Sequence, residues 1–409
     1  MKEPSYEVYG YRYTVLLVYM LAVAVNQLLW ITFASITSDA AAYYGVSFLS
    51  IGLLSMSFMI VYIVVSIPAS WVIDTYGIRV AVGIGAVLTG AFGLLRGLVA
   101  ADYTWVLVAQ LGIAVGQPFI LNATTAVAVR WFPVQERATA AGLGSLAMYL
   151  GIIVGLVLTP YVTIGSGIQG TLIAYGVFSA LAAVVFLAAA RENPPTPPCA
   201  PDQEARSLVF DGLKDILRKR DFVILLVVFF VGLGVFNAVT TWIEDILRPR
   251  GFSATQAGIV GGVMIIGGIV GAVLVPSLSD RYRRRVPFMV ASLAGAVVGL
   301  VGVTFATGYG LLLASAALLG LSLLSAGPVG FQYGAEIALP APEGTSTGLL
   351  LLMGQISGIA FIFAMDGFRA PETGSMTASL VVLAVLLGLG LVLCTMLRES
   401  PMMKGHTGD

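Results

Sequence analysis

Apolar residues run in long blocks along most of the chain, and short polar stretches separate the blocks. A membrane-spanning α-helix needs roughly 20 mostly apolar residues. About twelve blocks reach this length, at 13–37, 48–70, 80–100, 104–128, 138–160, 171–190, 221–246, 254–276, 286–306, 310–334, 345–368 and 374–397. The pattern therefore predicts an all-α integral membrane fold with twelve transmembrane helices.

The polar segment 191–220 divides these blocks into two sets of six. It is rich in proline and charge, and from Leu208 to Leu217 its spacing is that of an amphipathic surface helix. We therefore expect an N-terminal six-helix bundle at 1–190 and a cytoplasmic linker with an amphipathic helix at 191–220. A C-terminal six-helix bundle with a short tail should follow at 221–409.

Polar residues interrupt the first block in the stretch VNQLLWITFASI, 25–36. On a continuous helix, one face would carry Asn26, Trp30, Phe33 and Thr37. Polar side chains in hydrocarbon are unfavourable unless they form hydrogen bonds, so this stripe predicts the wall of a cavity. Bonding between helices is the better interpretation for the residues off that face, Gln27, Thr32 and Ser35.

Three other blocks carry polar or aromatic residues in their middle. The seventh block, which is the counterpart of the first, has Asn237, Thr240, Thr241 and Trp242. The fourth block has Gln110 and Gln117, and the eleventh has Gln355. These positions are further candidates for a cavity lining.

Composition and charge agree with a membrane protein and indicate no nucleic-acid partner. Hydrophobic residues make up 58% of the chain, charged residues make up 10%, and the formal net charge is zero. Alternating the loops from a cytoplasmic N-terminus places seventeen of the 21 Lys and Arg inside and four outside. This bias predicts that both termini are cytoplasmic, in a multi-pass protein of the plasma membrane. We see no removable signal peptide at the N-terminus.

An internal repeat relates the two halves. PASWVIDTYGIR (68–79) corresponds to VPSLSDRYRRR (275–285), and the aspartates Asp74 and Asp280 are 206 residues apart. Tandem six-helix halves of this kind form a central site at their interface near the bilayer midplane. We therefore expect two pseudo-symmetric bundles around a central cavity.

These loops resemble the signature of the major facilitator superfamily, roughly G-x-L-x-D-R-x-G-R-R. The matching positions are Asp74, Gly77 and Arg79 in the first half and Leu278, Asp280, Arg281, Arg284 and Arg285 in the second. The stretches WFPVQER (131–137) and GIIVGLVLTP (151–160) are also similar to that superfamily. The resemblance implies the major facilitator fold and transport by alternating access.

Within the superfamily, the chain most resembles the feline leukaemia virus subgroup C receptor family. The segments that carry this likeness are NQLLWITFASI, YYGVS, PASWVIDTYGIR and EIALPAPEGTSTGLLLLMGQISGIAF (336–361). Members are associated with choline, ethanolamine and haem. The resemblance implies a cation site at Trp30, Gln117, Trp242 and Gln355, although the family usually has tyrosine at the position of Trp242.

Aromatic rings suit a quaternary ammonium ion because cation–π attraction contributes ~0.5–2 kcal/mol per ring. The neighbouring Asn26, Asn237 and Thr241 complete the candidate substrate-binding set. The alternative is that the tryptophans pack between helices or lie at the membrane interface, and that the glutamines bond across helices.

Charged residues at the inner ends of helices are candidates for a gate. In the superfamily such residues form ion pairs between helices that hold the outward-facing state. The charged candidates are Asp74, Arg79, Arg137, Asp280, Arg281, Arg284 and Glu336, and Gly77 of the same motif is included with them. The alternative is that the basic inner loops only set the orientation of the chain in the membrane.

Outer charges are expected to be solvated or paired at the rim. They are Arg96, Glu244, Asp245, Asp366 and Arg369. If exposed, Glu244 and Asp245 would form an acidic vestibule that attracts cations.

Several chemistries are not expected. His406, in the tail, is the only histidine, so no histidine is available within the membrane for haem, a metal or a proton relay. The two cysteines, Cys199 and Cys394, indicate neither a disulfide framework nor a metal site. Neither a phosphate-binding loop nor a catalytic constellation is present, so we expect no cofactor and no enzymatic activity.

The sequence leaves three functions open. The first is a uniporter that moves a small organic cation such as choline by rocker-switch alternating access. The second is a proton-coupled exporter of drugs or organic anions, and the third is a membrane receptor that does not transport. The expected partners are a small-molecule substrate and the lipid bilayer, and the expected state is a monomer.

Overall fold

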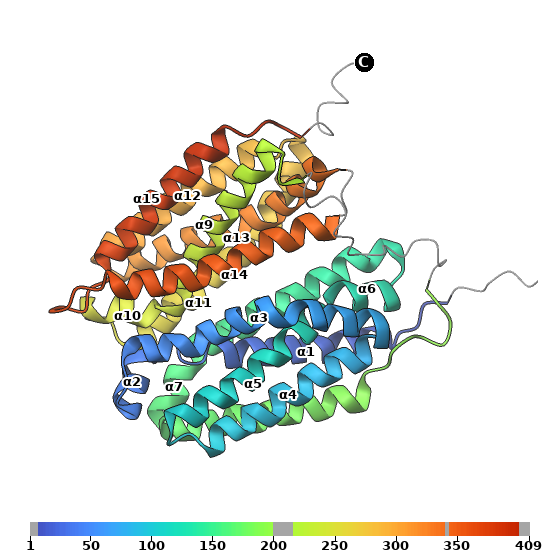
Figure 1. The fold of residues 1–409 in the computed structure, drawn as a ribbon, viewed down its shortest axis with the longest axis horizontal. Coiled ribbons are helices and arrows are strands. Elements are labelled where there is room, and N and C mark those ends of the chain that lie inside the picture. The colour runs from blue at the N-terminus through green and yellow to red at the C-terminus, as the bar shows by residue number, and fades with distance from the viewer. Residues whose placement is uncertain (1–6, 199–215, 340–342, 401–409) are drawn as a thin grey trace, which may run out of the picture. The chain divides into compact units, whose positions relative to one another are not determined.

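The computed structural model describes residues 7–198, 216–339 and 343–400 (Figure 1). The chain forms two compact units, Met1–Ala205 and Arg206–Asp409, which we describe separately. Every regular element in the described ranges is helical. The predicted amphipathic helix at 208–217 lies outside the described residues except for its last two positions.

The N-terminal unit contains α1 (Arg12–Ile31), α2 (Thr37–Tyr44), α3 (Phe48–Tyr76), α4 (Ile78–Leu98), α5 (Tyr103–Leu121), α6 (Thr124–Trp131) and α7 (Val134–Ala189). The apolar part of α7, Thr139–Ala189, is 51 residues long. A straight helix of that length would be about 77 Å long, more than twice the thickness of the hydrocarbon core. Gly167, at φ 69° and ψ 175°, interrupts the helical backbone, so α7 contains both the fifth and the sixth predicted spans.

The C-terminal unit contains α9 (Arg220–Thr241), α10 (Ile243–Leu247), the 3₁₀ turn η2 (Arg248–Arg250), α11 (Ala254–Tyr282), α12 (Val286–Phe305), α13 (Tyr309–Ala338), α14 (Glu343–Gly367) and α15 (Thr377–Thr395). Eleven described helices are long and apolar enough to cross a membrane, and α7 accounts for two predicted spans. The predicted all-α membrane fold is therefore confirmed.

Side chains at the helix starts explain several boundaries. Ser253 accepts a hydrogen bond from the backbone of Gln256, whose side chain accepts one in return, and this capping box starts α11. Asp102 accepts from two backbone N–H groups at the start of α5.

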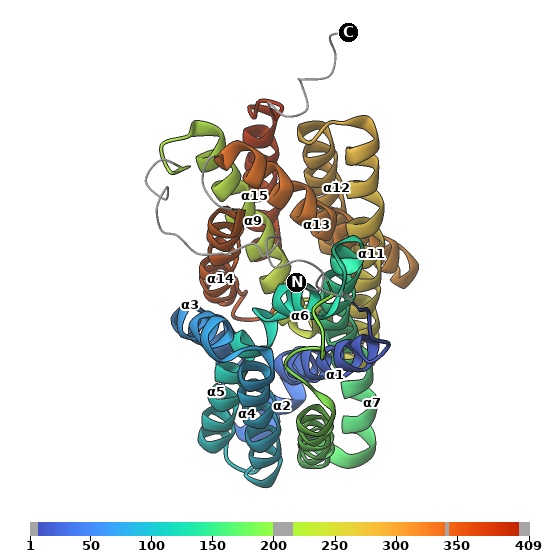
Figure 2. The same cartoon turned by 90° about the vertical axis from the view of Figure 1, so that its right-hand side faces the viewer.

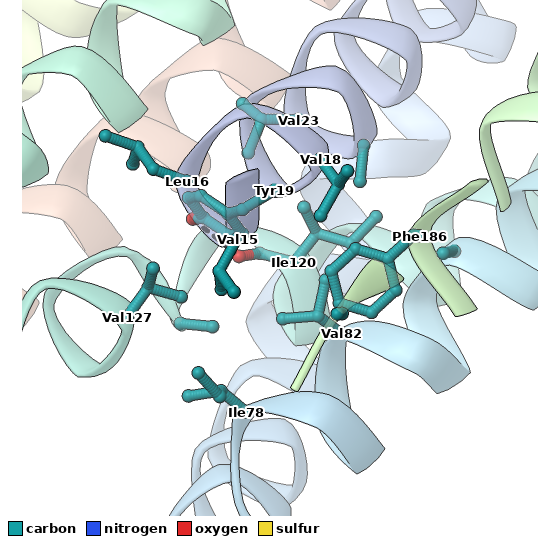
Figure 3. Close-up of a cluster of buried hydrophobic side chains, with 14 of the residues drawn as sticks. Val15, Leu16, Val18, Tyr19, Val23, Ile78, Val82, Ile120, Val127 and Phe186 are labelled. Carbon is teal, nitrogen blue, oxygen red and sulfur yellow. Dashed lines mark hydrogen bonds between the residues drawn. The ribbon is translucent and has the colours of Figure 1, made fainter. Parts of the chain in front are cut away.

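Within the N-terminal unit, α4 packs against α5 and α7, and α7 also packs against α1 (Figure 2). An apolar cluster at one end of these helices includes Val15, Tyr19, Val82, Ile120 and Phe186 (Figure 3). In the C-terminal unit, α13 packs against α11 and α12, and α14 packs against α9.

Glycines allow the closest of these helix contacts. A Cβ on Gly151 would overlap the backbone of Ala24, and a Cβ on Gly271 would overlap that of Leu321. The pairs α1–α7 and α11–α13 therefore approach more closely than larger side chains would permit.

Candidate functional site

The first transmembrane helix is broken beside Trp30. Helix α1 ends at Ile31, and a turn leads to α2, which begins at Thr37. The predicted continuous face is therefore wrong beyond Ile31: Phe33 lies in an apolar cluster with Ile36, and Thr37 opens the next helix. Trp30 is 6% exposed, and its indole N–H donates to the carbonyl of Ser55 on α3 at 3.2 Å.

Arg96 and Gln110 bind the carbonyl end of α1. The Arg96 guanidinium donates to the Leu29 carbonyl at 3.0 Å and to Gln110 Oε1 at 2.6 Å, and the ring of Phe33 lies 5.6 Å from its Cζ. A cation at a helix C-terminus is favoured by the helix dipole. Arg96 is fully buried and pairs with no described carboxylate, so its predicted place at a solvated rim is wrong.

The side-chain amides of the N-terminal unit differ in their hydrogen bonding. Asn26 is buried and donates to Thr89 Oγ1 at 3.1 Å, and Gln27 donates to Asn26 at 3.4 Å. Gln117 is 7% exposed, and its side chain forms no hydrogen bond with a described residue. The hydrogen bonds of Asn26 favour a role in helix packing. The donor and acceptor groups of the Gln117 amide are used by no described residue.

Trp242 lies at the break between α9 and α10 in the C-terminal unit. Its side chain is fully buried, and its indole N–H donates to the carbonyl of Ile362 on α14 at 3.2 Å. The guanidinium of Arg369 lies over the Trp242 ring, 5.2 Å from its centroid. One face of this ring is therefore occupied by a cation of the protein itself.

Ion pairs surround this break. Arg369 binds Asp245 at 3.0 Å and Asp366 at 3.2 Å. Arg248 binds Glu244 at 3.3 Å and Asp245 at 3.6 Å. Because Glu244 and Asp245 are both buried, the predicted acidic vestibule is wrong; the two carboxylates are paired, as expected, but are not solvated.

Three remaining candidates lie on α9 and α14. Asn237 donates to the carbonyl of Gly354 at 3.2 Å, next to Gln355. Gln355 is half-buried and, like Gln117, forms no side-chain hydrogen bond with a described residue. The Thr241 hydroxyl is buried without a described partner.

The C-terminal unit also has an apolar pocket, which none of the candidate residues lines. Helices α9, α12 and α13 form it, with Phe229, Leu233, Met289, Leu293 and Leu323 among its walls. No group of three or more described His, Cys, Asp or Glu residues could hold a metal ion.

At the other end of the N-terminal unit, Glu192 caps α4. Its carboxylate accepts from the backbone N–H of Ile78 at 3.0 Å and of Arg79 at 2.7 Å, and it pairs with Arg130. A Cβ on Gly77 would overlap this carboxylate, and Gly77 also has φ 89°. Two physical reasons therefore require glycine there.

Glu192→Gln should lower the free energy of unfolding by about 1–2 kcal/mol, because the anion at the helix N-terminus and its charge-assisted bonds are lost. Glu136→Gln is the matched control, since Glu136 is 42% exposed in its pair with Arg12 (3.1 Å) and binds no helix N-terminus among the described residues, so its loss should cost no more than about 1 kcal/mol. Thermal unfolding in detergent compares the two. Equal losses for both variants would contradict the capping role.

Arg285 is the centre of the corresponding region in the C-terminal unit. Its guanidinium pairs with Asp280 and, at 3.1 Å, with Glu336, while its backbone N–H donates to Glu399 at 2.8 Å. Burial lowers the pKa of Arg285, but its bonds with Asp280 and Glu336 outweigh burial and leave the pKa above its usual value.

The other predicted gate residues have different surroundings. Arg137 donates to the carbonyls of Phe132 and Val129 at the end of α6. Asp74, Arg79, Arg281 and Arg284 are exposed, and none of them forms an ion pair with a described residue.

Glu192, Glu399 and Arg285 were not among the predicted site residues. The repeat contained a signal for the two glutamates: RENP (191–194) and RESP (398–401) are 207 residues apart. Each glutamate accepts from a backbone N–H at the start of the third membrane-spanning helix of its unit, α4 or α12.

Comparison with known proteins gives consistent matches over nearly the whole chain. The family model described as "Major Facilitator Superfamily" matches residues 15–362. Solute carrier family 49 member A3 of Xenopus tropicalis is 30% identical over 385 residues, which cover 90% of this chain and 80% of that protein. Choline/ethanolamine transporter FLVCR1 of Felis catus is 29% identical over 415 residues, which cover 95% and 73%.

Solved structures share the fold at low sequence identity. A bacterial homologue of the human lysosomal transporter Spinster, in an inward-facing and unoccupied conformation, has a TM-score of 0.75 and 16% identity, and the match covers 97% of this chain and 100% of that one. A D-xylose-proton symporter has a TM-score of 0.72 and 15% identity, with coverages of 97% and 99%.

Proposed function

Because the chain belongs to the major facilitator superfamily of membrane transporters, we propose that it moves a small organic cation such as choline by rocker-switch alternating access through a central cavity. It is a multi-pass membrane protein. The proposal places it in the plasma membrane as a monomer, with both termini in the cytoplasm.

Two observations in the N-terminal unit carry the proposal: an anchored tryptophan on α1, and a glutamine on α5 whose side chain forms no hydrogen bond with a described residue. Trp30 is fixed by its bond to Ser55, so its ring is preorganised, whereas Gln117 retains both its donor and its acceptor. A ring can hold a quaternary ammonium ion, and an amide can bind the hydroxyl of choline. Similarity to proteins named choline/ethanolamine transporters supports this substrate class.

In the C-terminal unit, Gln355 is the candidate whose amide is equally unbonded. Asn237 binds the carbonyl of the residue before Gln355, and Thr241 lies one turn further along α9; we include both in the proposed site. Trp242 belongs to the proposal only if Arg369 leaves its ring face during the transport cycle. We assign Asn26 to the support of the site, because its amide is engaged by Thr89.

We propose that the inner charges form the gate. Asp280 and Glu336 act through Arg285, which holds both carboxylates. Asp74, Gly77, Arg79 and Arg137 form the corresponding group in the N-terminal unit, where Glu192 fixes the start of α4.

Uptake of labelled choline into vesicles should follow the membrane potential without a pH gradient. A potential of ~100 mV is worth about 2.3 kcal/mol per charge, or roughly fifty-fold accumulation of a monovalent cation. The measurement is uptake at a series of potassium diffusion potentials, with empty vesicles as the control. Uptake that needs a pH gradient would favour a proton-coupled exporter, and binding without counterflow would favour a receptor.

A further inference from the structure

Three arginines lie at the end of α11 and in the turn that leads to α12, and none has a described carboxylate partner. They are Arg281, Arg283 and Arg284, and all three are exposed. The nearby carboxylates Asp280 and Glu336 are both bound by the next residue, Arg285. Arg281, Arg283 and Arg284 therefore form no ion pair with these acidic neighbours, whose carboxylates Arg285 already binds.

The exposed residues that precede this turn indicate where the end of α11 lies relative to the lipid headgroups. Leu274 and Leu278 are exposed apolar side chains near the end of α11. Tyr282 follows, 63% exposed, with its ring stacked on Phe288 at 6.1 Å. Tyrosine is enriched in membrane proteins at the level of the lipid headgroups, so we expect the three arginines at the depth of the lipid phosphates.

The equivalent turn in the N-terminal unit has the same aromatic marker but lacks the cluster. Tyr76 corresponds to Tyr282 and packs against Trp71, with ring centroids 5.6 Å apart. The next residue is Gly77 at φ 89°, whereas its counterpart Arg283 has φ 51°. Glycine is the residue that suits this left-handed conformation, so an arginine there is disfavoured by the turn itself.

We propose that Arg281, Arg283 and Arg284 bind the phosphate group of an anionic phospholipid at the membrane surface. Guanidinium groups pair with phosphate through two parallel hydrogen bonds, and basic clusters beside a transmembrane helix attract anionic lipids. The bound lipid holds the segment that also contains Asp280 and Arg285, so it stabilises the ion pairs of Arg285 with Asp280 and Glu336. This site is independent of the identity of the transported substrate.

The test is binding of phosphatidylglycerol to delipidated protein, measured by native mass spectrometry against phosphatidylcholine. The wild type should prefer phosphatidylglycerol, and the variant R281Q/R283Q/R284Q should lose at least about tenfold in apparent affinity for it. R79Q changes the single arginine of the equivalent turn and should keep the preference. Equal binding of the two lipids by the wild type, or an unchanged preference in the triple variant, would overturn the proposal.

A second variant separates binding from folding. Arg283→Gly should leave the melting temperature in detergent unchanged or higher, because glycine suits the turn, and should still weaken binding of phosphatidylglycerol. Inorganic phosphate distinguishes a lipid from a soluble anion: it should not displace the lipid at equal concentration. Displacement by phosphate, or full lipid binding by Arg283→Gly, would contradict the lipid site.

Discussion

Replacing Trp30 by leucine is expected to weaken choline binding by roughly tenfold or more, because the substitution removes the aromatic face and keeps an apolar side chain. Trp30→Phe should fall between leucine and the wild type, since its ring attracts a cation less strongly. The measurement is the dissociation constant of choline on purified protein, compared with that of 3,3-dimethyl-1-butanol, its neutral isostere. The wild type should discriminate between the two, and Trp30→Leu should not.

The ratio of the two dissociation constants, for choline and for its neutral isostere, distinguishes loss of the cation–π contact from loss of folding. Trp30 is almost completely buried and bonded to Ser55, so truncation will also lower the melting temperature. Trp131→Leu is the matched control, because Trp131 is similarly buried in the same unit but is not a candidate ligand. If Trp131→Leu lost the same discrimination, or Trp30→Leu kept it, Trp30 would not be the cation contact.

Arg285→Gln should be the most destabilising substitution at the inner end of the C-terminal unit. It leaves the buried Glu336 carboxylate without its cation, and breaking a buried pair in this way destabilises by about 3–5 kcal/mol. The double variant R285Q/E336Q should recover much of that loss, because neither charge then remains buried alone. Thermal unfolding of the four proteins in the double-mutant cycle measures the coupling.

Arg284→Gln provides the control for this cycle. Arg284 is the exposed neighbour of Arg285, so its loss should change stability by no more than about 0.5 kcal/mol in a zwitterionic detergent. If Arg284→Gln lost as much stability as Arg285→Gln, the total charge of the turn, rather than the buried ion pair, would determine stability. A double variant no more stable than Arg285→Gln would argue against coupling with Glu336.

Hydrophobic pattern predicted the fold well because lipid imposes a length on every spanning helix. The all-helical architecture agrees with the pattern, and the resemblance to the major facilitator superfamily is confirmed by the family match and by relatives that include FLVCR1. Helix ends were less predictable. Helix α11 continues to Tyr282, beyond the predicted end of its span at 276, because polar residues outside the hydrocarbon can extend a helix without cost to burial.

The break after Trp30 was not predictable from periodicity. Nothing in the spacing of ITFASI marks a helix end, yet α1 ends at Ile31, where Arg96 and Gln110, distant in sequence, both bind the Leu29 carbonyl. Contacts between distant helices also explain why the predicted position of Arg96 was wrong. A sequence does not distinguish a buried guanidinium from one at the membrane rim when its partners are uncharged, as the Leu29 carbonyl and the Gln110 amide are here.

The sequence by itself determined the membrane class, the twofold repeat, the superfamily and the short set of polar and aromatic residues from which a site can be built. These follow from spacing along the chain, which lipid thickness and helical geometry constrain locally. Only the tertiary structure decided which of those side chains are already engaged: Asn26 by Thr89, Trp242 by Arg369 and Asp280 by Arg285. Hydrogen bonds and ion pairs depend on distances between helices, and no periodicity in one helix specifies them.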